Sequence, residues 1–220
     1  MIETTEPQVQ PAGHRPVGVV ALLPEVLKTL LLALIIFLTA RLLLLPYQVD
    51  GRSMEPSLAD QERVLVNRAV YMHFDLERLV GWVPGVNVAS GDYYPFHSPE
   101  RGDVVVVNPP WYAEEPFIKR TIGVAGDTIT IRDGQVLVNG MVLDEPYLYG
   151  IETDCRSEVY CTEFVVPPDT IFVMGDNRPH SFDSREFGPV PLENVIGQAW
   201  FSNWPADRFG PIPDVQPEGP

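Results

Sequence analysis

Two residues of this 220-residue chain have the chemistry of an acid–base pair, Ser53 and Lys119. Lys119 stands out because the chain holds thirteen arginines and only two lysines. An arginine keeps its proton near neutral pH, whereas a desolvated lysine can lose it. Lys119 lies in the apolar, strand-like run 117–124, where burial penalises the ammonium form. An ordinary salt-bridged lysine is the alternative interpretation.

Ser53 needs a partner, because a serine becomes a useful nucleophile only when a base takes its proton. Lys119 is the favoured base, since apolar burial can lower a lysine pKa from about 10.4 to about 7 or 8. A Ser-His-Asp arrangement is the alternative, with His180 close in sequence to Asp176 and Asp183. Of the other histidines, His14 precedes the membrane helix, and His73 and His97 belong to the irregular segment 72–100 without an obvious orienting acid.

One apolar run, Val26–Leu45, is long enough to cross a bilayer as a helix of about 30 Å. Pro46 is expected to stop it. A cleaved secretory signal is the alternative, but no small-residue cleavage site follows the run. The predicted division is a disordered tail at 1–24, a transmembrane anchor at 25–46, a β domain at 47–202 and a Pro-rich tail at 203–220.

Charge and composition limit the partners and cofactors that can be expected. The net charge of −15 argues against nucleic acid as a partner. The four histidines lack metal-ligand spacing, so neither a metal nor another cofactor is expected. The two cysteines, Cys155 and Cys161, are spaced for a small loop disulfide in an oxidising compartment, with free thiols as the alternative.

From Tyr47 onward, short β-branched runs alternate with turn residues, which predicts a mainly β domain. The Asp133-Gly134 pair between two alternating runs is the strongest hairpin signal. The segment 72–100 is rich in aromatic residues and fits the pattern least; its aromatic side chains either pack in the core or rest in a membrane interface. The predicted strands are 63–67, 103–107, 128–132, 135–138, 162–166, 170–174 and 195–201.

Four ordered blocks after the membrane helix resemble the bacterial type I signal peptidases. The resemblance reaches about Trp200 and leaves out both tails, the 72–100 segment and the Cys155–Cys161 loop. The blocks are Ser53-Met54-Glu55-Pro56-Ser57-Leu58, Arg101-Gly102-Asp103-Val104-Val105, Lys119-Arg120-Thr121-Ile122-Gly123-Val124-Ala125-Gly126-Asp127, and Gly175-Asp176-Asn177-Arg178 continuing to Ser181, Asp183, Ser184 and Arg185.

The resemblance implies a signal-peptidase-like antiparallel β domain that removes signal peptides from exported preproteins. It implies a single-pass anchor in the bacterial cytoplasmic membrane, with the catalytic domain on the extracytoplasmic side and the bilayer as a partner. Ser53 matches the nucleophile, Lys119 the general base and Ser181 the hydroxyl that orients the lysine. Some members carry a serine, an oxyanion donor, where this chain has Gly51.

The resemblance implies supporting roles for Asp176, Asp183 and Arg185. Asp183 and Arg185 match a charged pair that shapes a loop, and Asp176 falls in the same block. A polar turn without a catalytic part is the competing interpretation for all three. A second rival is a non-catalytic, membrane-tethered β domain that binds an extracellular partner, which offers no reason for the isolated Lys119.

Overall fold

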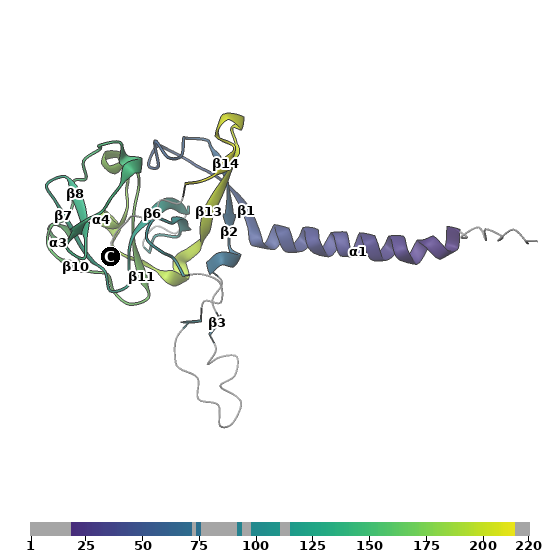
Figure 1. Ribbon diagram of the computed structural model, residues 1–220. Coiled ribbons are helices and arrows are strands. Elements are labelled where there is room, and N and C mark those ends of the chain that lie inside the picture. Colours follow the sequence, from purple (N-terminus) through teal and green to yellow (C-terminus); the bar gives the residue numbers. More distant parts are fainter. Residues whose placement is uncertain (1–18, 72–73, 76–91, 94–97, 111–114, 214–220) are drawn as a thin grey trace, which may run out of the picture. The chain divides into compact units, whose positions relative to one another are not determined.

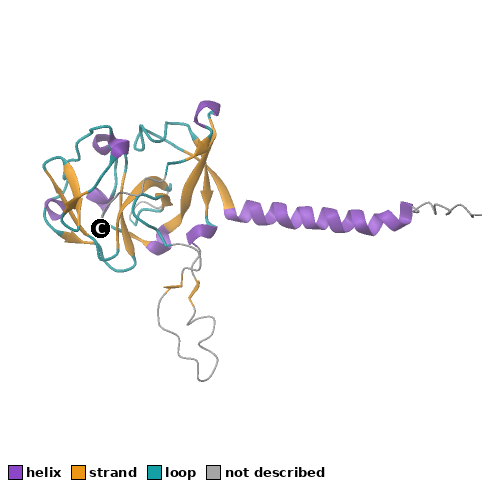
Figure 2. Ribbon diagram, in the orientation of Figure 1, coloured by secondary structure: helices purple, strands orange, loops and turns teal. Residues whose placement is uncertain are grey.

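The computed structural model describes residues 19–71, 74–75, 92–93, 98–110 and 115–213. The chain divides into two compact units, residues 1–42 and 43–220. In the first unit the described part is helix α1, and in the second it is a domain built mainly of antiparallel strands (Figures 1 and 2). The predicted mainly β fold with one N-terminal apolar helix is confirmed.

Helix α1 spans Val19–Leu43, and its stretch Pro24–Leu43 is apolar and long enough to cross a membrane. It begins inside the segment expected to be a tail, and residues 1–18 lie outside the described part. The expectation that Pro46 stops the helix is wrong. Pro46 lies in strand β1, Leu44–Gln48, opposite Leu65. As β1 is the end strand of its sheet, a proline is tolerated there.

The second unit contains two larger sheets and a short two-stranded one. The main sheet has the order β1-β2-β13-β5-β6-β11-β12, with β14 beside β13, and the four-stranded sheet has the order β10-β7-β8-β9. The remaining strands are β2 Arg63–Asn67, β3 Phe74–Asp75, β4 Asp92–Tyr93, β5 Val104–Val107, β6 Phe117–Val124, β7 Thr128–Arg132, β8 Gln135–Val138, β9 Met141–Val142, β10 Phe164–Val165, β11 Thr170–Met174, β12 Val190–Pro191, β13 Val195–Trp204 and β14 Gly210–Pro211.

Short helices connect these strands. Two are α-helical, α3 Glu158–Cys161 and α4 Ser184–Phe187. The others are single 3-10 turns: η1 Ala69–Tyr71, η2 Pro146–Leu148, η3 Arg178–His180, η4 Leu192–Asn194 and η5 Ala206–Arg208. Turn η3 and helix α4 flank the segment that carries Ser181 and Asp183, and Arg185 lies in α4 itself.

The predicted strands are present with small changes of boundary, and Asp133-Gly134 joins β7 to β8 as expected. The predicted unstructured tail is wrong for residues 203–213. Strand β13 continues to Trp204 and pairs with β14, and the Ile212 backbone N–H donates to Trp200 O at 2.9 Å. Ile212 is buried among apolar side chains, so it ties this segment to the domain despite its prolines.

Three apolar clusters form the core. One, with Met54, Leu58, Val64 and Val106, lies beneath the Ser53 loop. A second joins β7 and β8 to β6 and β11, and a third packs around β5, β11 and α4.

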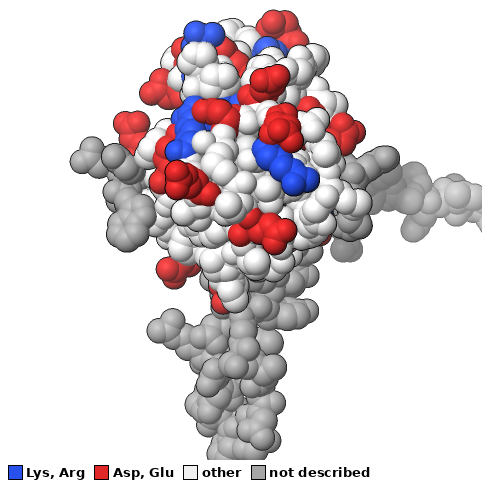
Figure 3. Space-filling model, turned by 90° about the vertical axis from the view of Figure 1, so that its left-hand side faces the viewer, with Lys and Arg blue, Asp and Glu red and all other residues white. Residues whose placement is uncertain are grey.

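The aromatic segment 72–100 is described only at 74–75, 92–93 and 98–100, so the two interpretations of its side chains lie outside the described residues. Elsewhere the acidic composition is visible at the surface. Acidic side chains are spread over the face of the domain drawn in Figure 3, with basic side chains in smaller groups among them.

Candidate active site

Ser53 lies in the loop between β1 and β2. Met54 and Leu58 follow it and are completely buried in the core, so they hold the turn from below. The Leu58 backbone N–H donates to Met54 O at 2.9 Å, which closes the turn. At the other end the Gly51 N–H donates to Asp60 Oδ1 at 2.8 Å. The Ser53 side chain is left partly exposed above this base.

A second loop, 175–177, is hydrogen-bonded to the Ser53 turn. The Asn177 backbone N–H donates to Ser53 O, and the Asn177 side-chain amide donates to Arg52 O, both at 3.0 Å. A Cβ atom at Gly175 would lie 2.4 Å from Ser53 O and 2.2 Å from Ser181 Oγ. Only a residue without a side chain permits so close an approach, so Gly175 sets the spacing between these two segments.

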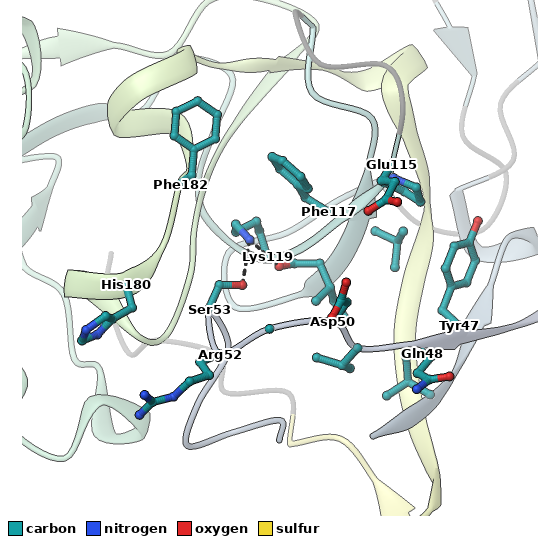
Figure 4. Close-up of a pocket in the computed structure, with 16 residues that line it drawn as sticks. Tyr47, Gln48, Asp50, Arg52, Ser53, Glu115, Phe117, Lys119, His180 and Phe182 are labelled. Atoms are coloured by element: carbon teal, nitrogen blue, oxygen red, sulfur yellow. Dashed lines mark hydrogen bonds between the residues drawn. The ribbon is translucent and has the colours of Figure 1, made fainter. Parts of the chain in front are cut away.

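Lys119 reaches the same point from β6, 66 residues further along the chain. Its Nζ lies 3.0 Å from Ser53 Oγ and donates to Ile118 O at 3.0 Å (Figure 4). The residue is 3% exposed, and the Phe117 ring lies 5.1 Å from Nζ. The structure thus brings together the two residues that the sequence singled out, and it places the amine in a nearly water-free position.

Burial lowers the pKa of Lys119 from 10.5 to about 8. The carboxylates of Asp183, Asp176 and Glu186 act in the opposite direction and offset part of this effect. The effect of desolvation on the pKa is larger than that of the carboxylates, because the ammonium loses its hydration shell while the three carboxylates lie in other ion pairs. The amine is therefore neutral in a substantial fraction of molecules near pH 8.

Ser181 is buried next to Gly175 but does not bond to Lys119. Its Oγ makes no hydrogen bond of ordinary geometry with the described residues, although it lies near enough to Asp183 to help lower the pKa of that carboxyl. A buried hydroxyl without a partner is costly. The orienting role that the resemblance implies for Ser181 is thus not seen as a direct hydrogen bond to Lys119.

The supporting charged residues form two buried ion pairs. Asp176 receives two bonds from Arg120, at 3.0 and 2.8 Å. Asp183 receives two from Arg185, both at 2.8 Å, and also caps helix α4. Burial acts to raise the pKa of Asp183, but the bonds from Arg185 and from the Gly175 N–H outweigh it and lower that pKa.

These carboxylates are unavailable to His180. The His180 ring contacts Asn177 Oδ1 through Nδ1 at 3.0 Å, while Asp176 and Asp183 are bound by Arg120 and Arg185. A catalytic histidine must be oriented by its acid. The Ser-His-Asp alternative left open by the sequence is therefore not formed.

Ser53 and Lys119 line a cleft of about 500 Å³. One wall is the segment 47–53 and the other is 115–119, with the Phe182 ring and His180 at one end (Figure 4). On β6, Phe117–Lys119 pair with β5 along one edge, whereas the pairing with β11 reaches only to Arg120. Among the described strands, the second edge of Phe117–Lys119 is therefore free to bind an extended peptide.

Comparisons with known proteins agree with this arrangement. A family model described as signal peptidase, peptidase S26, matches residues 23–204. The chain belongs to the S26 family of signal peptidases. It is thus an enzyme, a serine protease that cleaves signal peptides, and no match favours the non-catalytic alternative. The match covers both the apolar helix and the β domain.

Three relatives align with this chain over most of their own length. Signal peptidase I of Leptolyngbya laminosa is 30% identical over 94% of this chain and 91% of its own. Signal peptidase I of Bacillus amyloliquefaciens is 32% identical over 83% of this chain and 88% of its own. Signal peptidase IB of Staphylococcus aureus is 30% identical over 80% of this chain and 85% of its own.

Sequence reasoning missed the contacts that Gly175 and Asn177 make with the Ser53 turn, and those that Arg156 makes with the carbonyl oxygens of Pro179 and Ser181. The first two stood inside a recognised block, but the short run Gly175-Asp176-Asn177 also fits a plain polar turn. Their contacts to the Ser53 turn cross more than 120 residues, so no local pattern reveals them. Arg156 lay in a loop outside every block of the resemblance.

We predict that Gly175→Ala removes most signal-peptide cleavage, because the new methyl group would force the Ser53 and Ser181 segments apart. A shift of about 1 Å in an active site can cost about 10²-fold in rate. Gly123→Ala is the matched control, since its methyl group would meet the flexible end of Ile129 in the core. Cleavage assays at a temperature where both variants are folded test this; equal rates for the two variants would contradict it.

Proposed function

We propose that Ser53 and Lys119 are the catalytic pair of this signal peptidase, acting as nucleophile and general base. The observation that carries the proposal is the 3.0 Å contact between Ser53 Oγ and the buried Lys119 Nζ. A deprotonated amine at that distance can accept the hydroxyl proton. Its lowered pKa supports this role near neutral pH.

Catalysis then proceeds in two stages. Neutral Lys119 takes the proton of Ser53 while Oγ attacks the scissile carbonyl, and the resulting ammonium returns a proton to the leaving amine. Cleavage of that bond leaves an acyl-enzyme on Ser53. The amine then activates a water molecule, whose attack releases the signal peptide as a carboxylate and restores Ser53.

The oxyanion formed in each stage is stabilised in this proposal by the Ser53 backbone N–H. Gly51 provides no side-chain donor, and its own N–H is already bound to Asp60. Asn177 supports the donor indirectly, because its bonds to Ser53 O and Arg52 O fix the orientation of the turn. Asp176, Asp183, Arg185 and Ser181 are proposed as positioning residues around this turn.

The substrate is proposed to bind as an extended strand along the free edge of Phe117–Lys119. Addition of a strand supplies main-chain hydrogen bonds at a regular spacing. The resemblance implies small residues at the first and third positions before the cut, and the cleft has its nucleophile at one wall. Signal peptides of exported preproteins are thus the proposed partners.

Helix α1 is proposed as a single-pass anchor in a bacterial cytoplasmic membrane, with residues 44–220 on the extracytoplasmic side. Its apolar stretch suits a bilayer, and the Cys155–Cys161 disulfide suits an oxidising compartment. Only nine residues separate Leu43 from Ser53, a reach of at most about 35 Å. The reaction would therefore take place near the bilayer surface.

Ser53→Ala and Lys119→Met should each abolish cleavage of a preprotein by the full-length enzyme in detergent. Lys119→Met should remain at least as stable as the wild type at pH 7, since burying the ammonium costs about 3 kcal/mol at that pH. Cleavage rates and chemical denaturation measure the two effects. A Lys119→Met enzyme that cleaves at the wild-type rate would overturn the proposed base.

The rate should depend on pH through Lys119. Because burial places its pKa at about 8, the neutral base accumulates as the pH rises through that value. We expect kcat/KM to rise between pH 6.5 and 9 with a midpoint near 8, at roughly tenfold per pH unit on the acid side. A midpoint near the ordinary lysine value of about 10.4 would show that the amine is not desolvated in solution.

The proposed topology predicts the behaviour of a C-terminal alkaline phosphatase fusion, which is active only after export. In a bacterial host the full-length fusion should be active, and the same fusion lacking residues 24–43 should not. An inactive full-length fusion, with both proteins made in equal amounts, would place the domain on the cytoplasmic side. The two fusion proteins keep the same β domain, so they differ only in the anchor.

A further inference from the structure

Arg156 lies outside every motif considered so far, yet it binds three backbone carbonyls of the segment 178–181. It follows Cys155 in the loop closed by the Cys155–Cys161 disulfide. Its guanidinium donates to Arg178 O at 3.0 Å, to Pro179 O at 2.7 Å and to Ser181 O at 2.7 Å. It also forms an ion pair with Glu186.

These three carbonyls belong to one turn, η3 and the residue after it. A single 3-10 turn leaves its carbonyls without partners inside the turn. The planar guanidinium presents several donors in a fixed fork, so one side chain can bind them all. Arg185 also donates to Arg178 O, but among the described side chains Arg156 alone binds both Pro179 O and Ser181 O.

The turn links the two sides of the active site. At its beginning Asn177 binds the carbonyls of Arg52 and Ser53. At its end the Ser181 side chain is buried beside Gly175, close to the Ser53 backbone. A displacement of this turn would therefore move Ser53 and open the buried surroundings of Lys119 to water.

The loop that carries Arg156 is itself held at both ends. Cys155 is bonded to Cys161 and packs against the core cluster formed by β6, β7, β8 and β11. Tyr160, within the loop, is buried with its ring 5.0 Å from Phe164 and 5.2 Å from Phe172. The backbone beside Arg156 is thereby fixed, which reduces the entropy lost in ordering its long side chain.

We propose that Arg156, presented by the Cys155–Cys161 loop, is a positioning residue that holds the 178–181 turn against Ser53 and Lys119. The inference rests on the catalytic roles proposed for that pair. Arg156 touches neither of them and does not line the cleft. Its loss should therefore reduce kcat, with little change in KM, and should raise the pKa of Lys119 as water enters.

The test compares Arg156→Ala and Arg156→Lys with the wild type, using full-length enzyme in detergent and a preprotein substrate. We expect kcat to fall about 10–100-fold in Arg156→Ala, with the midpoint of the pH–rate profile moved to higher pH. Arg156→Lys keeps the charge near Glu186 but lacks the fork that binds three carbonyls, so it should retain most of the defect. Arg132→Ala, at an exposed arginine of β7, is the control and should behave as the wild type.

The Cys155→Ser/Cys161→Ser double variant tests the loop separately. It keeps Arg156 but releases one end of its backbone, so its pH midpoint should move in the same direction. A wild-type midpoint and kcat in this variant would overturn the part assigned to the disulfide loop.

A wild-type kcat and pH midpoint in folded Arg156→Ala would overturn the proposal, even if the variant melted at a lower temperature. If Arg156→Ala does not fold, the same two readouts in Arg156→Lys decide the question, and wild-type values there would overturn it. Failure of the catalytic assignment is recognised independently, because Ser53→Ala or Lys119→Met would then retain cleavage whatever Arg156→Ala does.

Discussion

The exclusion of water from Lys119 is the constraint on which the rest of the domain depends. In water this amine would keep its proton and could accept nothing from Ser53. Burial lowers its pKa to about 8, while the Ser53 hydroxyl stays partly exposed 3.0 Å away. The fold must therefore bury the amine of Lys119 and leave the hydroxyl of Ser53 open to substrate. It does so by placing Lys119 on strand β6 and Ser53 in a surface loop.

Ion pairs around the site also help to keep the pKa of Lys119 low. Three fully buried arginines lie near it, and each binds a carboxylate: Arg120 with Asp176, Arg178 with Glu145 and Arg185 with Asp183. Asp176 and Asp183 would otherwise favour the ammonium form of Lys119 more strongly. Since arginine keeps its proton near neutral pH, it can hold these carboxylates in ion pairs while Lys119 titrates.

Much of the fold could be predicted from local patterns. The alternating runs 128–132 and 135–138 and the Asp133-Gly134 turn form the expected hairpin. The errors occurred where distant contacts overrode local preference. Pro46 lies in an edge strand because Leu44–Gln48 pair with β2, and residues 203–213 are ordered because Ile212 enters the core. The pairing of β14 with β13 is local, but the core cluster that Ile212 enters includes Val49 and Met54, which lie more than 150 residues earlier in the chain.

By itself, the sequence determined the apolar helix, the β character of the domain and the chemical identity of the pair, because these depend on residue type and on spacing within short runs. Only the tertiary structure decided that Lys119 meets Ser53, that Asp176 binds Arg120, that neither Asp176 nor Asp183 binds His180, and that Gly175, Asn177 and Arg156 hold the site together. Those contacts join segments that lie up to 125 residues apart. Their geometry depends on sheet register and close packing, which no local pattern encodes.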